Sequence, residues 1–212
     1  MHIPDGFLTN EVWMPAAVVS AAAISIAVKN SNKQLLEKSV PRLGIISAFI
    51  FAAQMINFPV AGGTSGHLLG SALAVALMGP WLASVSISLV LIIQCLLFQD
   101  GGVTALGANV FNMAIVGVYS AYFIQKIFSQ SSKFRKYGII LSAWFSVVAA
   151  SFACSLELSF SEVAPYKVVI PAMLIIHSLI GIGEAIITLA VYNAVCKFIP
   201  DMRNNNFLNN TG

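Results

Sequence analysis

The sequence predicts an all-α polytopic membrane protein with about seven transmembrane helices. Apolar residues make up 58% of the 212-residue chain, charged residues make up only 9%, and the mean hydropathy is +0.86. A soluble domain carries roughly 25% charged residues, so the charged side chains here are too few to cover a water-exposed surface. The composition therefore excludes an ordinary soluble enzyme, a disordered protein and a nucleic-acid-binding protein.

Apolar segments follow one another along nearly the whole chain. A helical span requires about 20 apolar residues, so this length leaves room for six or seven spans and for no separate soluble domain. We expect spans over residues 12–28, 43–58, 67–79, 80–98, 103–125, 138–156 and 168–199. They form one transmembrane domain over residues 1–199, and residues 200–212 form a short polar cytoplasmic tail.

The first apolar segment is expected to stay in the protein as a helix. A signal peptide begins with positive charge, whereas this chain begins with Met-His-Ile-Pro-Asp-Gly and its first basic cluster follows the apolar run. The segment is rich in alanine, which suits close packing against another helix. Pro41 precedes the second segment, and the sequence Phe-Pro-Val-Ala-Gly-Gly over residues 58–63 ends it.

The third segment, 67–79, is short. Its thirteen residues reach about 20 Å at ~1.5 Å each, less than the ~30 Å hydrocarbon core, so taken alone it also fits a re-entrant segment. Gly79-Pro80 divides it from the fourth segment, and Asp100-Gly101-Gly102 ends the fourth.

The basic residues indicate the number and direction of the spans. Ten of the 11 Lys and Arg residues fall within residues 29–42, within 126–137 or near the C-terminal end. Cytoplasmic loops are rich in Lys and Arg. All ten lie on one side only if residues 67–98 cross the membrane twice, which predicts seven spans with the N-terminus outside and the C-terminus inside.

Polar residues at membrane depth are candidates for function, and the histidines come first. The amine of Met1, the backbone nitrogen of His2 and the imidazole Nδ1 of His2 form fused five- and six-membered chelate rings around one metal ion. Such a tetragonal nitrogen site suits Ni²⁺ or Cu²⁺, and Co²⁺ is a further candidate. Retention of Met1 is expected, because the enzyme that removes it requires a small second residue.

His67 is the best candidate for a fourth ligand, since it lies among glycines at the outer end of the third span. The alternatives are a frayed terminus for His2 and a helix-capping hydrogen bond for His67. His177 and Glu184 are seven residues apart and share a helix face, where an interhelical hydrogen bond is favoured over direct ligation. Asp100 is interpreted as a turn residue.

Several motifs, taken in order along the chain, resemble one known family. They are MHIPDGFL at 1–8, NFPV at 57–60, GTSGHLLG at 63–70, QCLLFQDGG at 94–102, LGAN at 106–109, NM at 112–113 and HSLIGIGE at 177–184. The chain thereby resembles the CbiM/NikM family, the substrate-specific (S) components of energy-coupling-factor cobalt and nickel transporters. The resemblance runs from Met1 to about residue 199.

This resemblance implies the S-component helical bundle with one extra N-terminal helix, in the plasma membrane of a prokaryote. It implies metal ligation by Met1, His2 and His67, the same set that the chemistry of the residues suggests. Residues that orient these ligands are expected among polar neighbours, namely Ser65, Gln94, Asn109, His177 and Glu184. The transported substrate is Ni²⁺ or Co²⁺, and the sequence does not distinguish the two.

The resemblance also implies partner subunits. The chain has no G-x-x-x-x-G-K-[ST] phosphate loop, so it is expected to be no enzyme and to work with two separate ATPase subunits and a transmembrane coupling (T) subunit. Some relatives carry a further membrane segment, which here corresponds to a separate small membrane subunit where one is present.

Two alternatives remain open from the sequence. An S component for an organic vitamin would have an aromatic and polar binding site and would not need a free N-terminus. An intramembrane enzyme would use His177 and Glu184, but the chain lacks H-E-x-x-H, G-x-S-x-G and an aspartate pair.

Overall fold

The computed structural model of the chain describes residues 1–32, 39–60, 64–129 and 132–199, and these are mostly helical. The helices are α1 (Asn10–Asn32), α2 (Ser39–Gln54), α3 (Ser71–Phe98), α4 (Leu106–Val110), α5 (Val118–Phe128), α6 (Ser132–Phe160) and α7 (Tyr166–Phe198). A π-helical segment, η1 (Phe111–Gly117), joins α4 to α5. Two short antiparallel strands, β1 (Phe58–Val60) and β2 (Thr64–Gly66), precede α3.

The helices have the lengths and compositions that membrane spans require. Within the described ranges, five segments are long and apolar enough to cross a membrane: Asn10–Ser31, Ser71–Phe98, Leu106–Phe128, Phe134–Phe160 and Tyr166–Phe198. The shorter α2 is also apolar. The expected helical membrane protein is therefore confirmed as a mostly helical chain with a two-stranded hairpin, whereas seven spans and their direction remain predictions. The predicted polar tail, 200–212, lies outside the described residues.

The interior of α3 is broken at the position where the sequence analysis divided two spans. Gly79 has φ 78° and ψ 171°, which is a conformation that glycine adopts far more readily than other residues. Pro80 follows it and has no backbone N–H to continue the helical hydrogen bonds. The break separates residues 71–78 from residues 80–98, and the first half is buried along its whole length.

The second predicted span ends earlier than expected. Helix α2 stops at Gln54, and Phe58 lies in strand β1 opposite Gly66 of β2. An apolar run does not by itself distinguish a strand from the end of a helix. The result is a small hairpin between α2 and α3, which places the chain ahead of α3 inside the bundle.

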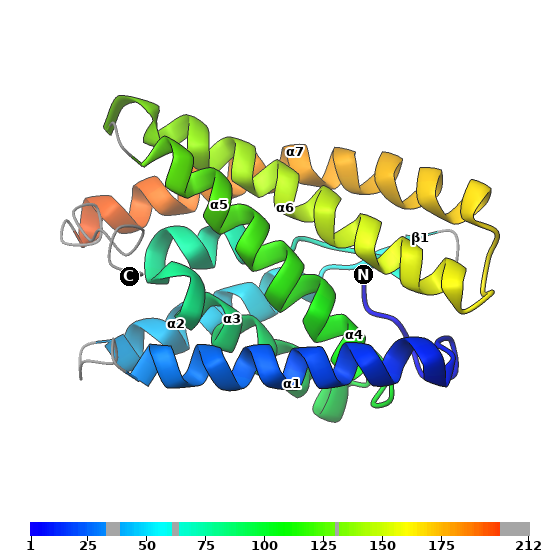
Figure 1. The fold of residues 1–212 in the computed structure, drawn as a ribbon. Helices are drawn as coiled ribbons and strands as arrows, with labels where there is room; N and C mark the ends of the chain where they lie inside the picture. The colour runs from blue at the N-terminus through cyan, green and yellow to red at the C-terminus, as the bar shows by residue number, and fades with distance from the viewer. Residues whose placement is uncertain (33–38, 61–63, 130–131, 200–212) are drawn as a thin grey trace.

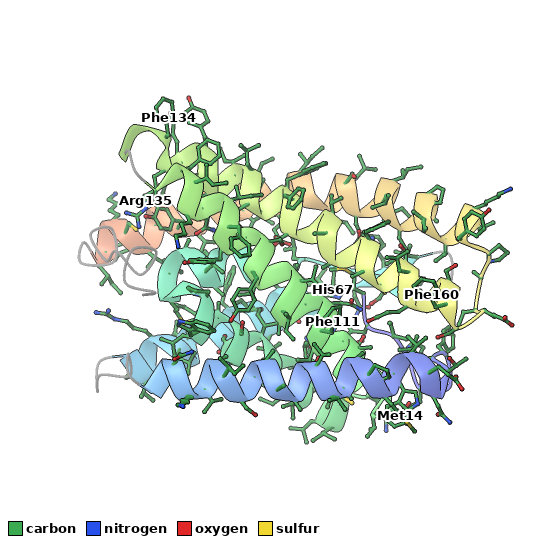
Figure 2. The ribbon with its side chains drawn as sticks, in the orientation of Figure 1. Met14, His67, Phe111, Phe134, Arg135 and Phe160 are labelled. Atoms are coloured by element: carbon green, nitrogen blue, oxygen red, sulfur yellow. The ribbon has the colours of Figure 1, made fainter. Side chains whose placement is uncertain are left out.

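The helices pack so that the N-terminal segment enters the bundle. Figure 1 shows α1 along one edge and α6 beside α7 along the opposite edge, with the N-terminus in the interior near the strands. The alanine-rich helix α1 packs closely against α4, as its sequence predicts. A Cβ on Gly107 would overlap the backbone of Ala17, and Ser20 Oγ donates to the Gly107 carbonyl at 2.7 Å. In Figure 2, Phe134 and Phe160 point away from the bundle, as residues facing lipid do.

Candidate metal centre

The first three residues of the chain are buried in the helical bundle. Met1 and Ile3 are 0% exposed and His2 is 4% exposed. The first residues of most domains are poorly ordered unless other contacts hold them. The frayed-terminus alternative for His2 is therefore wrong for this structure, and specific contacts must hold the segment in place.

The side chain of Asn109 on α4 holds the backbone of Ile3. Its Oδ1 accepts a hydrogen bond from the Ile3 N–H at 2.9 Å, and its Nδ2 donates to the Ile3 carbonyl at 3.1 Å. The N–H of Gly102 donates to the same carbonyl at 2.9 Å. Asn109 thus holds the N-terminal segment through the backbone of Ile3, and its role in orienting metal ligands stays a prediction.

Asp5 fastens the segment to the chain that follows α3. Its carboxylate accepts hydrogen bonds from the Val103 N–H at 3.0 Å, the Thr104 N–H at 2.7 Å and the Thr104 hydroxyl at 2.6 Å. These hydrogen bonds, those from Thr104 first, lower the pKa of Asp5. The sequence analysis did not identify this contact, because nothing near Asp5 in the sequence indicates that residues 103 and 104 face it.

The terminal amine lies against Ser65 on β2. It donates hydrogen bonds to the Ser65 carbonyl and, at 3.0 Å, to the Ser65 hydroxyl. The same hydroxyl accepts from the His2 backbone N–H at 3.3 Å. Burial lowers the pKa of the amine from 8.0 to about 5, so the amine is uncharged at neutral pH. Ser65 therefore contacts both of the first two backbone nitrogens.

The imidazole of His2 has a polar partner at each nitrogen. Nε2 lies 3.1 Å from the side-chain oxygen of Gln94, and Nδ1 lies 3.3 Å from Oδ1 of Asp100. Burial lowers the pKa of His2 to about 3, so the ring is neutral. Both partners are acceptor oxygens, so the neutral ring donates to one of them at a time. Donation from Nε2 to Gln94 leaves the lone pair on Nδ1, the atom that the chelate ring at the N-terminus requires.

His67 presents a lone pair inside the bundle. Its Nδ1 donates to the Leu68 carbonyl at 2.8 Å, and its Nε2 is buried with no hydrogen-bond partner among the described residues. Such orphaned buried polar atoms are rare and call for an explanation. Burial lowers the pKa of His67 well below its usual value, and the amine and His2 act in the same direction at a pH where they are protonated.

The side chain of His67 lies in the middle of the bundle, as Figure 2 shows. Its ring stacks on the ring of His2, with 4.6 Å between centroids and 22° between planes. The helix-capping alternative for His67 is wrong, because α3 begins four residues later, at Ser71, and its N-cap residue Gly70 makes no side-chain cap hydrogen bond. The two histidines predicted to act together are therefore in direct contact.

His177 and Glu184 lie on the same helix, α7, but have separate partners. Glu184 is 2% exposed and its carboxylate accepts hydrogen bonds from the backbone N–H groups of Leu69 at 2.5 Å and Gly70 at 2.8 Å. His177 Nδ1 donates to the Met173 carbonyl at 2.8 Å, within the same helix. Glu184 therefore bonds to the non-helical segment that carries His67, rather than making the interhelical hydrogen bond that the sequence favours.

Asp100 has a larger role than the turn residue expected from the sequence. Asn57 Nδ2 donates to its Oδ2 at 3.1 Å, while its Oδ1 faces His2. Burial raises the pKa of Asp100, and the nearby amine opposes that shift. One sequence signal was available, because Asp100 follows the same apolar segment that carries Gln94.

The residues brought together supply nitrogen donors rather than carboxylates or thiols. No group of three His, Cys, Asp or Glu side chains is arranged for a metal ion in the part of the chain that the structure describes. What the site offers is an uncharged amine, a backbone nitrogen and two neutral imidazoles, all shielded from water. This donor set suits late first-row transition metals in tetragonal geometry.

Known sequences similar to this one belong to metal transport proteins. Residues 2–202 match the family model described as the cobalt uptake substrate-specific transmembrane region. A protein of Archaeoglobus fulgidus, provisionally named a fused nickel transport protein NikMN, is 38% identical over 204 residues, which are 95% of this chain and 68% of the relative. The cobalt transport protein CbiM of Acetoanaerobium sticklandii is 32% identical over 93% of this chain and 85% of its own length.

Solved structures agree with the sequence relatives. A crystal structure described as a truncated transition metal transporter superposes with a TM-score of 0.88 at 34% identity, covering 93% of this chain and 99% of the other. A second, described as a transition metal transporter, has a TM-score of 0.86 at the same identity and covers 98% of this chain.

Proposed function

Because the chain belongs to the CbiM family of cobalt and nickel transport membrane proteins, we propose that it is the metal-capturing subunit of an ATP-driven importer. It is a multi-pass membrane protein and a transport protein rather than an enzyme. Residues 1–199 form its single metal-binding domain, and the substrate is Ni²⁺ or Co²⁺.

The substrate ion binds to four nitrogens. They are the amine of Met1, the deprotonated backbone nitrogen of His2, Nδ1 of His2 and Nε2 of His67. The observation that carries this proposal is the buried Nε2 of His67, which has no hydrogen-bond partner among the residues that the structure describes, on a ring stacked against His2. An ion lies in the plane of each imidazole that binds it, so metal binding must replace this stacking with coordination by the ring edges.

The residues around the four nitrogens orient them. Gln94 and the carboxylate of Asp100 hold the His2 ring, Asn109 holds Ile3, and Ser65 holds the first two backbone nitrogens. The negative charge of Asp100 beside His2 also favours a cation at Nδ1. Metal affinity depends on such orienting partners as well as on the ligands.

Transport requires energy and partners outside this chain. The proposed assembly contains a transmembrane coupling subunit, two ATPase subunits and, where present, a separate small membrane subunit. The chain itself has seven spans, with the N-terminus outside. In support, Lys29, Lys126 and Lys197 lie in the last turns of α1, α5 and α7, and these three helices end on the same side of the bundle (Figure 1).

Extension of the N-terminus tests the proposal against an organic substrate. Residues added before Met1 remove the amine from the ligand set and do not fit in the buried site. We expect nickel or cobalt uptake by cells that make the complete transporter to be lost, whereas the same residues added at the C-terminus leave it unchanged. Uptake that survives the N-terminal extension would contradict the four-nitrogen site and would favour the vitamin alternative.

A further inference from the structure

His67 lies in a short segment, residues 67–70, that has no regular secondary structure. Two backbone N–H groups of this segment, those of Leu69 and Gly70, donate to the carboxylate of Glu184 on α7. A carboxylate at membrane depth is energetically unfavourable unless it is paired or hydrogen-bonded. Here the two oxygens each have a backbone donor, so the position of Glu184 and the position of the segment depend on each other.

A second side chain, from α2, bonds to the peptide unit between Leu69 and Gly70. Gln54 on α2 donates from Nε2 to the Leu69 carbonyl at 2.8 Å. Gly70 has φ 79°, and a Cβ there would lie 2.9 Å from Ile50 on α2. The segment that carries His67 is therefore fixed between α7 and α2.

The other three proposed nitrogens are held by different parts of the fold. The segment that contains Met1 and His2 is bonded to Asn109 on α4 and to Gln94 in the second half of α3, and Asp5 fastens it to residues 103 and 104. The two groups of ligands meet at Ser65, which contacts the amine. The ligand set is thus divided between two sets of helices.

We propose that Glu184 is a positioning residue for metal binding, which holds the Nε2 of His67 within reach of the ion from α7. The inference rests on the proposed function, since it assumes that His67 binds the ion. The contact ties the position of His67 to α7 as well as to α3, which begins at Ser71.

A double-mutant cycle tests this role. Nickel binding is measured by visible absorption for the wild type, Glu184→Gln, His67→Ala and the double variant, each with its native N-terminus. Glutamine has nearly the same shape but only one acceptor oxygen, so one N–H of the segment loses its partner. We expect Glu184→Gln to lower the affinity about 10- to 100-fold and to shift the nickel band toward that of His67→Ala. In the His67→Ala background, Glu184→Gln should cause no further loss.

Two further variants separate positioning from general damage. Glu157→Gln alters another buried membrane carboxylate, whose partner is Asn112 on η1. Any change it causes in nickel affinity should be equal in the wild type and in His67→Ala. If thermal melting shows that Glu184→Gln does not fold, Gln54→Met removes the other hydrogen bond to Leu69, and its effect should also vanish when His67 is absent.

The outcomes distinguish the proposed four-nitrogen site from the positioning role of Glu184. A wild-type protein without a nickel band overturns the proposed function and this inference with it. A wild-type band with unchanged affinity in Glu184→Gln, or a loss that persists in the His67→Ala background, overturns the positioning role alone.

Discussion

The imidazoles of His2 and His67 stack at 4.6 Å between centroids in the interior of the bundle, although one is at the chain terminus and the other precedes α3. The contact joins a terminal segment that is fastened to α3 and α4 with a segment that is fastened to α7 and α2. Metal binding at this junction should respond to changes in either segment and to the charges around it.

Replacement of His67 by leucine should stabilise the metal-free protein and weaken metal binding, because three of the four nitrogens remain. Leucine removes a buried polar atom that has no partner among the described residues, and such an atom costs about 1–3 kcal/mol. Thermal melting without metal should show a higher midpoint for His67→Leu than for the wild type. Added nickel should raise the melting temperature of the wild type more than that of the variant. A leucine variant that melts earlier than the wild type would mean that the Nδ1 hydrogen bond to Leu68 and the stacking on His2 outweigh the cost of the orphaned Nε2.

The pH dependence of nickel binding should reveal the burial of the amine. With a pKa of about 5, the amine carries no proton at neutral pH, so the ion displaces only the backbone proton of His2. We expect the affinity to fall about tenfold per pH unit between pH 8 and pH 6, and more steeply below pH 5, where the amine is also protonated. If the amine were exposed, with a pKa near 8.0, binding of each ion between pH 8 and pH 6 would release about two protons, one from the amine and one from the His2 backbone nitrogen. Calorimetry in buffers of different ionisation enthalpy counts these protons.

A methyl group at Gly102 should displace the N-terminal segment. A Cβ there would overlap the backbone of Asp5, and the N–H of Gly102 donates to the Ile3 carbonyl. Gly102→Ala should therefore weaken nickel binding about 10- to 100-fold, as expected for the loss of contacts that orient ligands. Gly183→Ala on α7 is the matched control, because a methyl group added there would have no atom within 4 Å. Equal affinities of the two variants would contradict the account of how Met1 and His2 are held.

Neutralising Asp100 should weaken binding through charge. Its Oδ1 lies 3.3 Å from Nδ1 of His2, so a bound cation would be close to the carboxylate. Asp100→Asn keeps the size of the side chain and removes the negative charge. We expect about a tenfold loss of affinity, measured by competition with a chelator, and a difference that changes little with salt, because the contact is largely shielded from water. Equal affinities of the wild type and Asp100→Asn would mean that Asp100 only completes the turn after α3.

The sequence was most informative where local physics decides the outcome. Hydropathy and turn residues located the long spans, and Gly79-Pro80 marked the break inside α3, because span length and helix breakers are properties of neighbouring residues. The chelating chemistry of the terminus pointed to Met1 and His2. His67 stood out because a histidine is unusual at such a depth.

Contacts between distant segments were less predictable. The apolar run predicts a helical span through Phe58, where the structure has a strand, since such a run favours both. The roles of Asp5 and Asp100 depend on residues 103–104 and on His2, which only the tertiary fold brings near them. Glu184 was expected to orient ligands, but its partners, two backbone N–H groups, leave no trace in side-chain patterns.

The central claim is that the free N-terminus and His67 bind the ion together, and the visible absorption spectrum tests it most directly. Purified protein with its native N-terminus is titrated with Ni²⁺, alongside a variant with residues added before Met1. We predict a band of planar nickel that saturates at about one equivalent in the native protein and is absent from the extended one. Folded native protein without the band, or the same band in both proteins, would contradict the claim.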